Sequence, residues 1–149
     1  MRIDDQVEPL VREALTAVVK SDPERLRAAF TAFPDDEATT SGARLATAVS
    51  LYVLNDVYGQ RPTRAELKSV ADKLVEMEDW TDATSEEVVT FLSAAYDGIR
   101  ADKVLSVNRV APLAYLIAGN LLSSCCKDGE YWFNYLDRAE SALEASQDD

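Results

Sequence analysis

The sequence has no histidine and only five glycines among its 149 residues. Because histidine is the commonest general acid-base and a frequent metal ligand, its absence excludes Ser-His-Asp triads and every metal site that needs imidazole. The glycines are scattered, so no glycine-rich loop could hold a phosphate. Carboxylate-only catalysis is not excluded, but no pair among the 27 acidic residues stands out. We expect a protein that is not an enzyme and binds no cofactor or metal.

Cysteine is also scarce. Cys125 and Cys126 are adjacent, and on a helix their side chains point about 100° apart. They lack the two-residue separation of a redox or zinc-binding pair. We therefore expect two small hydrophobic side chains and no disulfide.

Basic residues are few. Fifteen Lys and Arg face 27 Asp and Glu, which gives a formal charge of −12. A negative surface repels nucleic acids and anionic lipids. Residues 63–98 have the outline of a helix-turn-helix, but the second helix, SEEVVTFLSAAYD, starts with two glutamates and offers no side chain suited to reading bases. We expect no direct nucleic-acid binding.

No segment is apolar enough to suggest a membrane helix. The most apolar run, residues 104–126, is interrupted by Asn108, Arg109, Pro112 and Asn120, and charge in the middle of a bilayer is costly. The first ten residues, MRIDDQVEPL, carry acids where a signal peptide has a basic region. We expect a cytoplasmic protein in which residues 104–126 belong to the core.

Alternating β-branched runs with hairpin turns are missing too, whereas helical periodicity is strong throughout. The pattern predicts an all-α fold, a single compact bundle of about seven amphipathic helices in one domain, residues 1–149, with residues 1–4 and 146–149 frayed. The expected helices cover residues 5–20, 23–33, 43–58, 64–75, 85–97, 102–127 and 130–145.

Helix-start signals support these boundaries. Asp22 precedes Pro23, and two capping boxes pair Thr63 with Glu66 and Thr84 with Glu87. Residues 35–42 are expected to form a polar connector. The helix over residues 102–127 is expected to break or kink near Pro112, whose ring clashes with the preceding turn.

The first candidate site is the segment EMEDWTDATSEE, residues 76–87, which contains no basic residue. Glu86 and Glu87 are explained by their place in the first turn of a helix. The other members could bind a basic partner, with the ring as an anchor and the acids as steering charges. They are Glu76, Glu78, Asp79, Trp80 and Asp82. The alternative is that Trp80 packs into the core and the acids form a solvated helix end.

The second candidate is the aromatic run YWFNY, residues 131–135. Helical spacing assigns Trp132 and Leu136 to the core and leaves Tyr131 and Tyr135 one turn apart near its boundary. Two adjacent tyrosines suit an interface, because each has a large apolar area and a polar tip. The alternative is that both only cover the edge of the core.

These observations favour a non-catalytic acidic helical protein that binds another macromolecule. The expected partner is a protein with a basic surface, as for an adaptor, an inhibitor or an immunity-like protein. One alternative is a small-ligand binder or enzyme with an inter-helix pocket lined by Tyr52, Tyr58, Tyr96 and Tyr115. Another is a self-associating assembly component, in which the chain would form a homo-oligomer.

Overall fold

The computed structural model confirms the all-α prediction. It describes residues 1–146, and these form a compact helical bundle without strands. The helices are α1 (Glu8–Val19), α2 (Pro23–Thr31), α3 (Asp36–Tyr58), α4 (Arg64–Met77), α5 (Ser85–Tyr96), α6 (Val107–Cys125) and α7 (Trp132–Ala145), with a short 3₁₀ turn, η1 (Ala101–Lys103), before α6. The expected frayed residues 147–149 lie outside the described part of the chain.

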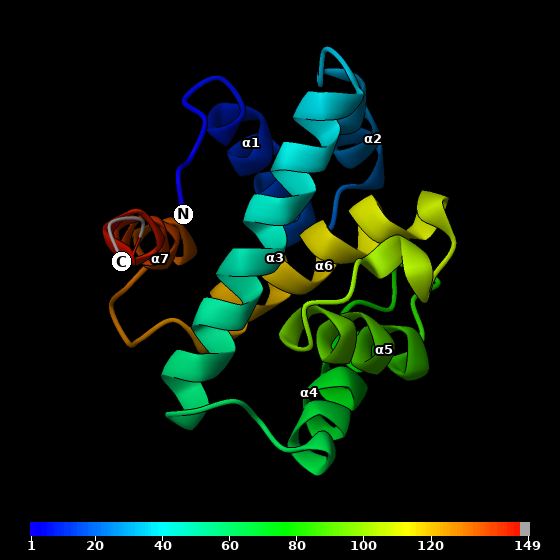
Figure 1. The fold of residues 1–149 in the computed structure, drawn as a ribbon, viewed down its shortest axis with the longest axis vertical. Coiled ribbons are helices and arrows are strands. Elements are labelled where there is room, and N and C mark those ends of the chain that lie inside the picture. The colour runs from blue at the N-terminus through cyan, green and yellow to red at the C-terminus, as the bar shows by residue number, and fades with distance from the viewer. Residues whose placement is uncertain (147–149) are drawn as a thin grey trace.

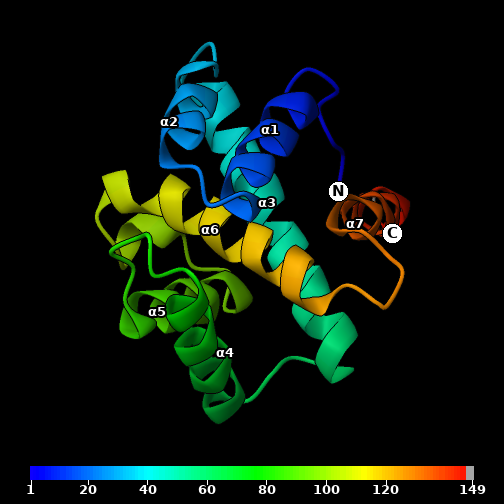
Figure 2. The same ribbon diagram turned by 180° about the vertical axis from the view of Figure 1, so that it is seen from behind.

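Two long helices, α3 and α6, cross at the centre of the molecule (Figures 1 and 2). In α6, every residue from Leu113 to Leu122 is buried, so this helix is enclosed on all sides. The remaining helices pack around the crossing: α1 and α2 at one end, α4 and α5 at the other, and α7 at the side (Figure 1). The prediction that the apolar run 104–126 contributes to the core is confirmed for its central part.

The helix starts follow the capping signals of the sequence. The Asp22 side chain accepts a hydrogen bond from the backbone N–H of Arg25, and the two capping boxes at Thr63 and Thr84 are complete. Each cap satisfies backbone donors that have no partner inside the helix. These predicted boundaries are confirmed.

The prediction of a polar connector over residues 35–42 is wrong. Asp35 caps α3 by accepting from the backbone N–H of Ala38, and the helix runs from Asp36 straight through Gly42. Gly42 is needed there because a Cβ atom would lie 2.4 Å from the Tyr115 hydroxyl and 2.8 Å from Cε1 of Phe33. Its absent side chain is a packing requirement rather than a helix-stop signal.

The predictions for α6 also need correction. The helix begins at Val107, five residues later than expected, and continues through Pro112 without a break. Pro112 lies in the second turn, so it removes only one helical hydrogen bond. The residues before α6 form η1 and an exposed turn instead of a first helical turn.

The two ends of the described chain meet beside α7 (Figure 1). The Met1 amino group donates to the carbonyl oxygen of Leu143 at 2.6 Å, and Ile3 packs against the core. Residues 1–4, which were expected to fray, therefore make defined contacts. Ser146 closes α7 by donating from its hydroxyl to the same carbonyl.

Candidate functional site

The acidic segment, residues 76–82, covers the end of α4 and the first part of the connection to α5, and it is partly turned inward. Nε1 of the half-buried Trp80 donates to Oε1 of Glu78 at 2.8 Å, and Nδ2 of the buried Asn120 donates to Oε2 of the same carboxylate at 2.8 Å. Glu78 thus ties the connection to the central helix α6. Trp80 packs against the core, as the alternative interpretation of this segment expected.

Arg109 on α6 binds a second part of the connection. Its guanidinium donates to both carboxylate oxygens of Glu87 at 2.9 Å and to Oδ1 of Asp82 at 2.9 Å. This arginine lowers the pKa of both Glu87 and Asp82 below their ordinary values, mainly through these hydrogen bonds. Both carboxylates therefore carry their charge in an internal ion-pair network.

Only part of the candidate acidic surface remains unengaged. Glu76 and Asp79 are exposed and form no ion pair among residues 1–146, and the apolar Met77 between them in sequence is 57% exposed. Glu78 and Asp82 have protein partners instead. Sequence reasoning missed this difference because Asn120 and Arg109 lie more than 25 residues further along the chain.

The Arg109 network yields a first prediction. Replacing Arg109 by Gln should loosen the α4–α5 connection, because Glu87 and Asp82 lose their shared cation while the helices keep their own capping. We expect faster backbone hydrogen exchange in residues 78–87 with little change in the centre of α6. Arg100→Gln is the matched control, since within residues 1–146 Arg100 pairs only with the nearby Asp102 and its side chain is 74% exposed. Equal exchange in both variants would contradict a structural role for Arg109.

The two tyrosines of the second candidate site, Tyr131 and Tyr135, lie in different environments. Tyr131 is 67% exposed and its ring stacks on Phe133 at 5.2 Å. Tyr135 is buried, its hydroxyl donates to Oδ2 of Asp56 at 2.5 Å, and the guanidinium of Arg138 lies 4.2 Å from its ring centre. Burial and the hydrogen bond to Asp56 raise the pKa of Tyr135. The prediction of a tyrosine pair at the core boundary is wrong for Tyr135, which is part of the α3–α7 packing.

The periodicity failed here because α7 turns a slightly different face inward. Tyr135, Leu136 and Ala139 are its buried residues, whereas Trp132 is half-buried against the core. Asp56 on α3 supplies the acceptor that a buried tyrosine hydroxyl requires. Nothing near Tyr135 in the sequence identifies that partner.

Three of the four tyrosines proposed to line a common pocket have different neighbours. Tyr115 is enclosed by Phe30 and Phe33, and burial raises its pKa. The Tyr96 hydroxyl donates to Oδ1 of Asn55 at 2.8 Å, and Tyr52 meets the edge of Tyr135. None of the four lines either of the two cavities described below. Neither cavity therefore supports a tyrosine-lined pocket, which stays a prediction.

The larger of these two cavities is a groove of about 700 Å³ between α3 and the segment that runs from the end of α5 through η1 to the start of α6. We call it the α3 groove. Its lining is Thr39, Thr40, Ala43, Arg44, Thr47, Ala48, Leu51, Phe91, Ala95, Gly98, Ile99, Arg100, Ala101, Asp102, Val107, Val110 and Ala111. The lining is mainly apolar, and three of its residues are charged.

Large apolar side chains are exposed at this groove. Val107 is 77% exposed and Ile99 46% exposed, and both belong to the lining. Val104, between them in sequence, is 44% exposed. The sequence analysis assigned Val104 and Val107 to the core because they belong to the most apolar run, residues 104–126. The late start of α6 at Val107 puts them at the surface instead.

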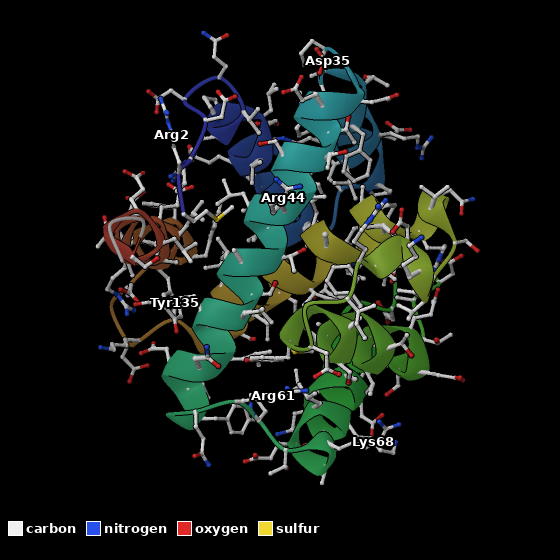
Figure 3. All side chains as sticks on the ribbon, in the orientation of Figure 1. Arg2, Asp35, Arg44, Arg61, Lys68 and Tyr135 are labelled. Carbon is white, nitrogen blue, oxygen red and sulfur yellow. The ribbon has the colours of Figure 1, made fainter. Side chains whose placement is uncertain are left out.

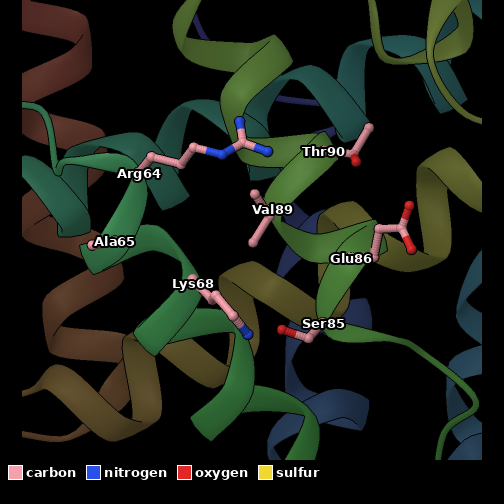
Figure 4. A pocket seen from close by; sticks show the side chains of 7 residues that line it. All are labelled: Arg64, Ala65, Lys68, Ser85, Glu86, Val89 and Thr90. Atoms are coloured by element: carbon pink, nitrogen blue, oxygen red, sulfur yellow. The ribbon is translucent and has the colours of Figure 1, made fainter.

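The smaller cavity, of about 550 Å³, lies between α4 and α5 (Figure 4). Arg64 and Lys68 extend from α4 toward α5, and Ser85, Glu86 and Thr90 are on the other side. Lys68 pairs with Asp72 at 3.2 Å, and the Ser85 hydroxyl donates to the same carboxylate. This network lowers the pKa of Asp72. Two of the polar groups that line the cavity, Lys68 and Ser85, therefore already have a partner in Asp72.

The described residues contain no group of three or more His, Cys, Asp or Glu side chains that could hold a metal ion. Cys125 and Cys126 are both free and half-buried, and burial raises the pKa of the Cys125 thiol. No helix within residues 1–146 is long and apolar enough to cross a membrane.

Comparison with known proteins yields no relative. No family model matches the chain, and searches of curated proteins and of solved structures each return no significant match.

Proposed function

We propose that this chain is a non-catalytic helical protein that binds a partner protein, and that the partner docks in the α3 groove. The observation that carries the proposal is the exposure of Val107 and Ile99 beside an apolar groove of about 700 Å³. Apolar side chains gathered at a hollow surface are typical of protein-protein interfaces, since burying them on binding gains free energy. An adaptor, an inhibitor and an immunity-like protein would all use such a surface.

The charge of the chain supports a partner whose surface is basic outside the docked segment. A protein of charge −12 attracts basic molecules from a distance, and such steering raises association rates. Glu76 and Asp79 remain available for this role, because they are exposed and form no ion pair within the described range 1–146. Steering of this kind weakens as salt rises.

The polar groups of the groove favour a protein over a small molecule. Small-ligand sites place a few free hydrogen-bonding groups on an apolar wall. Here the hydroxyls of Thr39 and Thr47 donate to the backbone carbonyl oxygens of Asp35 and Ala43 on their own helix. Apart from Arg44, which has no ion pair among residues 1–146, the lining thus offers mainly apolar area, and this area suits the side chains of a partner protein.

The test is affinity capture from a lysate of the source organism with wild type, Val107→Glu and the matched control Val57→Glu. Val57 is 51% exposed but lies outside the groove, so both substitutions place a carboxylate on an exposed valine. We expect one protein to be captured by wild type and Val57→Glu, and to fall about tenfold with Val107→Glu. Its yield should also fall from low to moderate salt.

Two results would contradict the proposal. Capture that is equal for all three proteins would show that the groove is not the docking surface. Recovery of no protein other than this chain would favour self-association, which light scattering of the purified protein would then measure. Thermal unfolding of the three proteins checks that each is folded.

A further inference from the structure

The α3 groove has a defined length. The residues that α3 contributes run from Thr39 to Leu51, which is about 18 Å along a helix axis. Apart from Leu51 at the end, these residues form adjacent pairs, and each pair lies four residues, about one helical turn, after the one before it. They therefore form one continuous face of α3. A wall of this length matches about three turns of a second helix packed along it.

The opposite wall is mainly apolar, apart from Arg100 and Asp102. It comprises Phe91 and Ala95 on α5, Ile99 after α5, and Val107 and Val110 at the start of α6. A helix laid between two apolar walls contacts both through side chains spaced i, i+3, i+4 and i+7. The occupant suited to this surface therefore has an apolar stripe.

The charges of the groove add a constraint. Arg100 and Asp102 form an ion pair at 2.6 Å and neutralise each other. Arg44 has no ion-pair partner among the described residues, although the chain carries a large excess of acids. It lies near the middle of the face that α3 presents, on the helix that crosses the centre of the molecule (Figure 3). The net charge of the lining is thus positive, opposite in sign to that of the whole protein.

We propose that the α3 groove binds an amphipathic helix of about three turns from the partner protein, with an Asp or Glu near its middle that pairs with Arg44. This inference rests on the proposed function and specifies the docked element. Arg44 would fix the position and direction of the bound helix in the groove, because an exposed charge pair contributes more to orientation than to affinity. The apolar stripe would supply most of the binding free energy.

The experiment is a selection from a display library of random peptides of about 16 residues on the full chain, with counter-selection on Val107→Glu. We expect enriched peptides to share apolar residues at helical spacing and a central Asp or Glu. The strongest peptide is then compared with its acid-to-Lys version by fluorescence anisotropy. Wild type should prefer the acidic peptide by about tenfold, and Arg44→Glu should reverse that preference.

Each contrary result would refute one named element of the proposal. Enriched peptides without helical periodicity, or no enrichment at all, would refute the helix. If wild type and Arg44→Glu preferred the acidic peptide over its Lys version to the same degree, the pairing with Arg44 would be refuted. If capture from lysate depends on Val107 while the selection fails, the proposed function stands and the inferred occupant is wrong. If capture does not depend on Val107, the docking surface itself is wrong.

Discussion

Replacing Gly119 by Ala is expected to destabilise the protein by about 2 kcal/mol, although alanine is the better helix former. Gly119 lies in the fully buried part of α6, where α1 packs against it. A Cβ atom at this position would lie 2.6 Å from Cγ1 and 2.9 Å from Cβ of Val18, and 3.6 Å from the backbone oxygen of Leu15. Carbon atoms in contact are normally about 3.5–4.0 Å apart.

The clash at Gly119 cannot be relieved by rotating a side chain alone. A rotation of the Val18 side chain moves Cγ1 but leaves Cβ in place, so α1 and α6 must separate. Overpacking of a core costs about 1–3 kcal/mol, and the upper end applies where backbones have to move. The helix-propensity gain of Gly to Ala, about 1 kcal/mol, offsets only part of that cost.

Chemical denaturation of four proteins tests this explanation: wild type, Gly119→Ala, Val18→Ala and the double variant. Val18→Ala alone should also destabilise, because it opens a cavity. In the double variant the new methyl group occupies part of the space that Val18 left, so its loss should be clearly smaller than the sum of the single losses. Additive losses would show that the contact between these two positions is not the cause.

Local signals explain why much of the fold could be predicted. The capping boxes at Thr63 and Thr84 and the Asp22 cap each involve residues within one turn, and the structure contains all three. The left-handed Gly59 that ends α3 is equally local, with φ of 75°. Features that depend on neighbours within about four residues are thus readable from the sequence.

The errors arose where distant residues decide the structure. Gly42 suggested a connector, but Tyr115 and Phe33 require a residue without a side chain inside α3. The acidic segment suggested an open surface, but Arg109 and Asn120 on α6 take up Asp82 and Glu78. No periodicity within a single segment contains this information.

The α3 groove was missed for a related reason. Val107 and Val110 have the spacing of core residues, and only the packing of α3 against α5 and α6 decides which of them is covered. In the structure Val110 is half-buried while Val107 is largely exposed. A candidate docking surface built from residue types that are common in cores has no compositional signal of its own. The acidic segment, residues 76–82, does have one.

A second large effect is expected at Glu140 on α7. Its Oε1 atom accepts from Arg12 on α1 at 3.3 Å, and its buried Oε2 atom has no hydrogen-bond partner in the part of the chain that the structure describes. The surrounding charged groups are Glu8 and Arg12 on α1 and Asp137 and Glu144 on α7. Desolvation and then the charge of Glu8 raise the pKa of Glu140 to about 7, because the cation of Arg12 is shared with Glu8 and Asp137.

The raised pKa of Glu140 fixes the sign of a pH dependence. Below the ordinary pKa of 4.5, Glu140 is protonated in both folded and unfolded chains, and its contribution to stability is fully present. Between 4.5 and about 7, the unfolded chain releases this proton while the folded chain keeps it, so stability falls as pH rises. Above about pH 7, Glu140 is ionised in both the folded and the unfolded chain, so the free energy of unfolding no longer changes through this group. The total decrease is on the order of 2 kcal/mol for a side chain that is 13% exposed.

Glu140→Gln should therefore remove this loss. The free energy of unfolding of the variant, minus that of wild type, should rise from pH 4.5 to about 7 and then level off, which makes the variant the more stable protein at about pH 8. Subtracting the wild-type curve cancels the acid sensitivity of carboxylates such as Glu87, whose lowered pKa acts in the opposite direction. Glu76→Gln is the control and should change little, because Glu76 is exposed, forms no ion pair among residues 1–146 and is not among the charged groups around Glu140. A difference curve for Glu140→Gln that is flat, or that falls with pH, would show that Glu140 is already ionised in the folded protein well below pH 7.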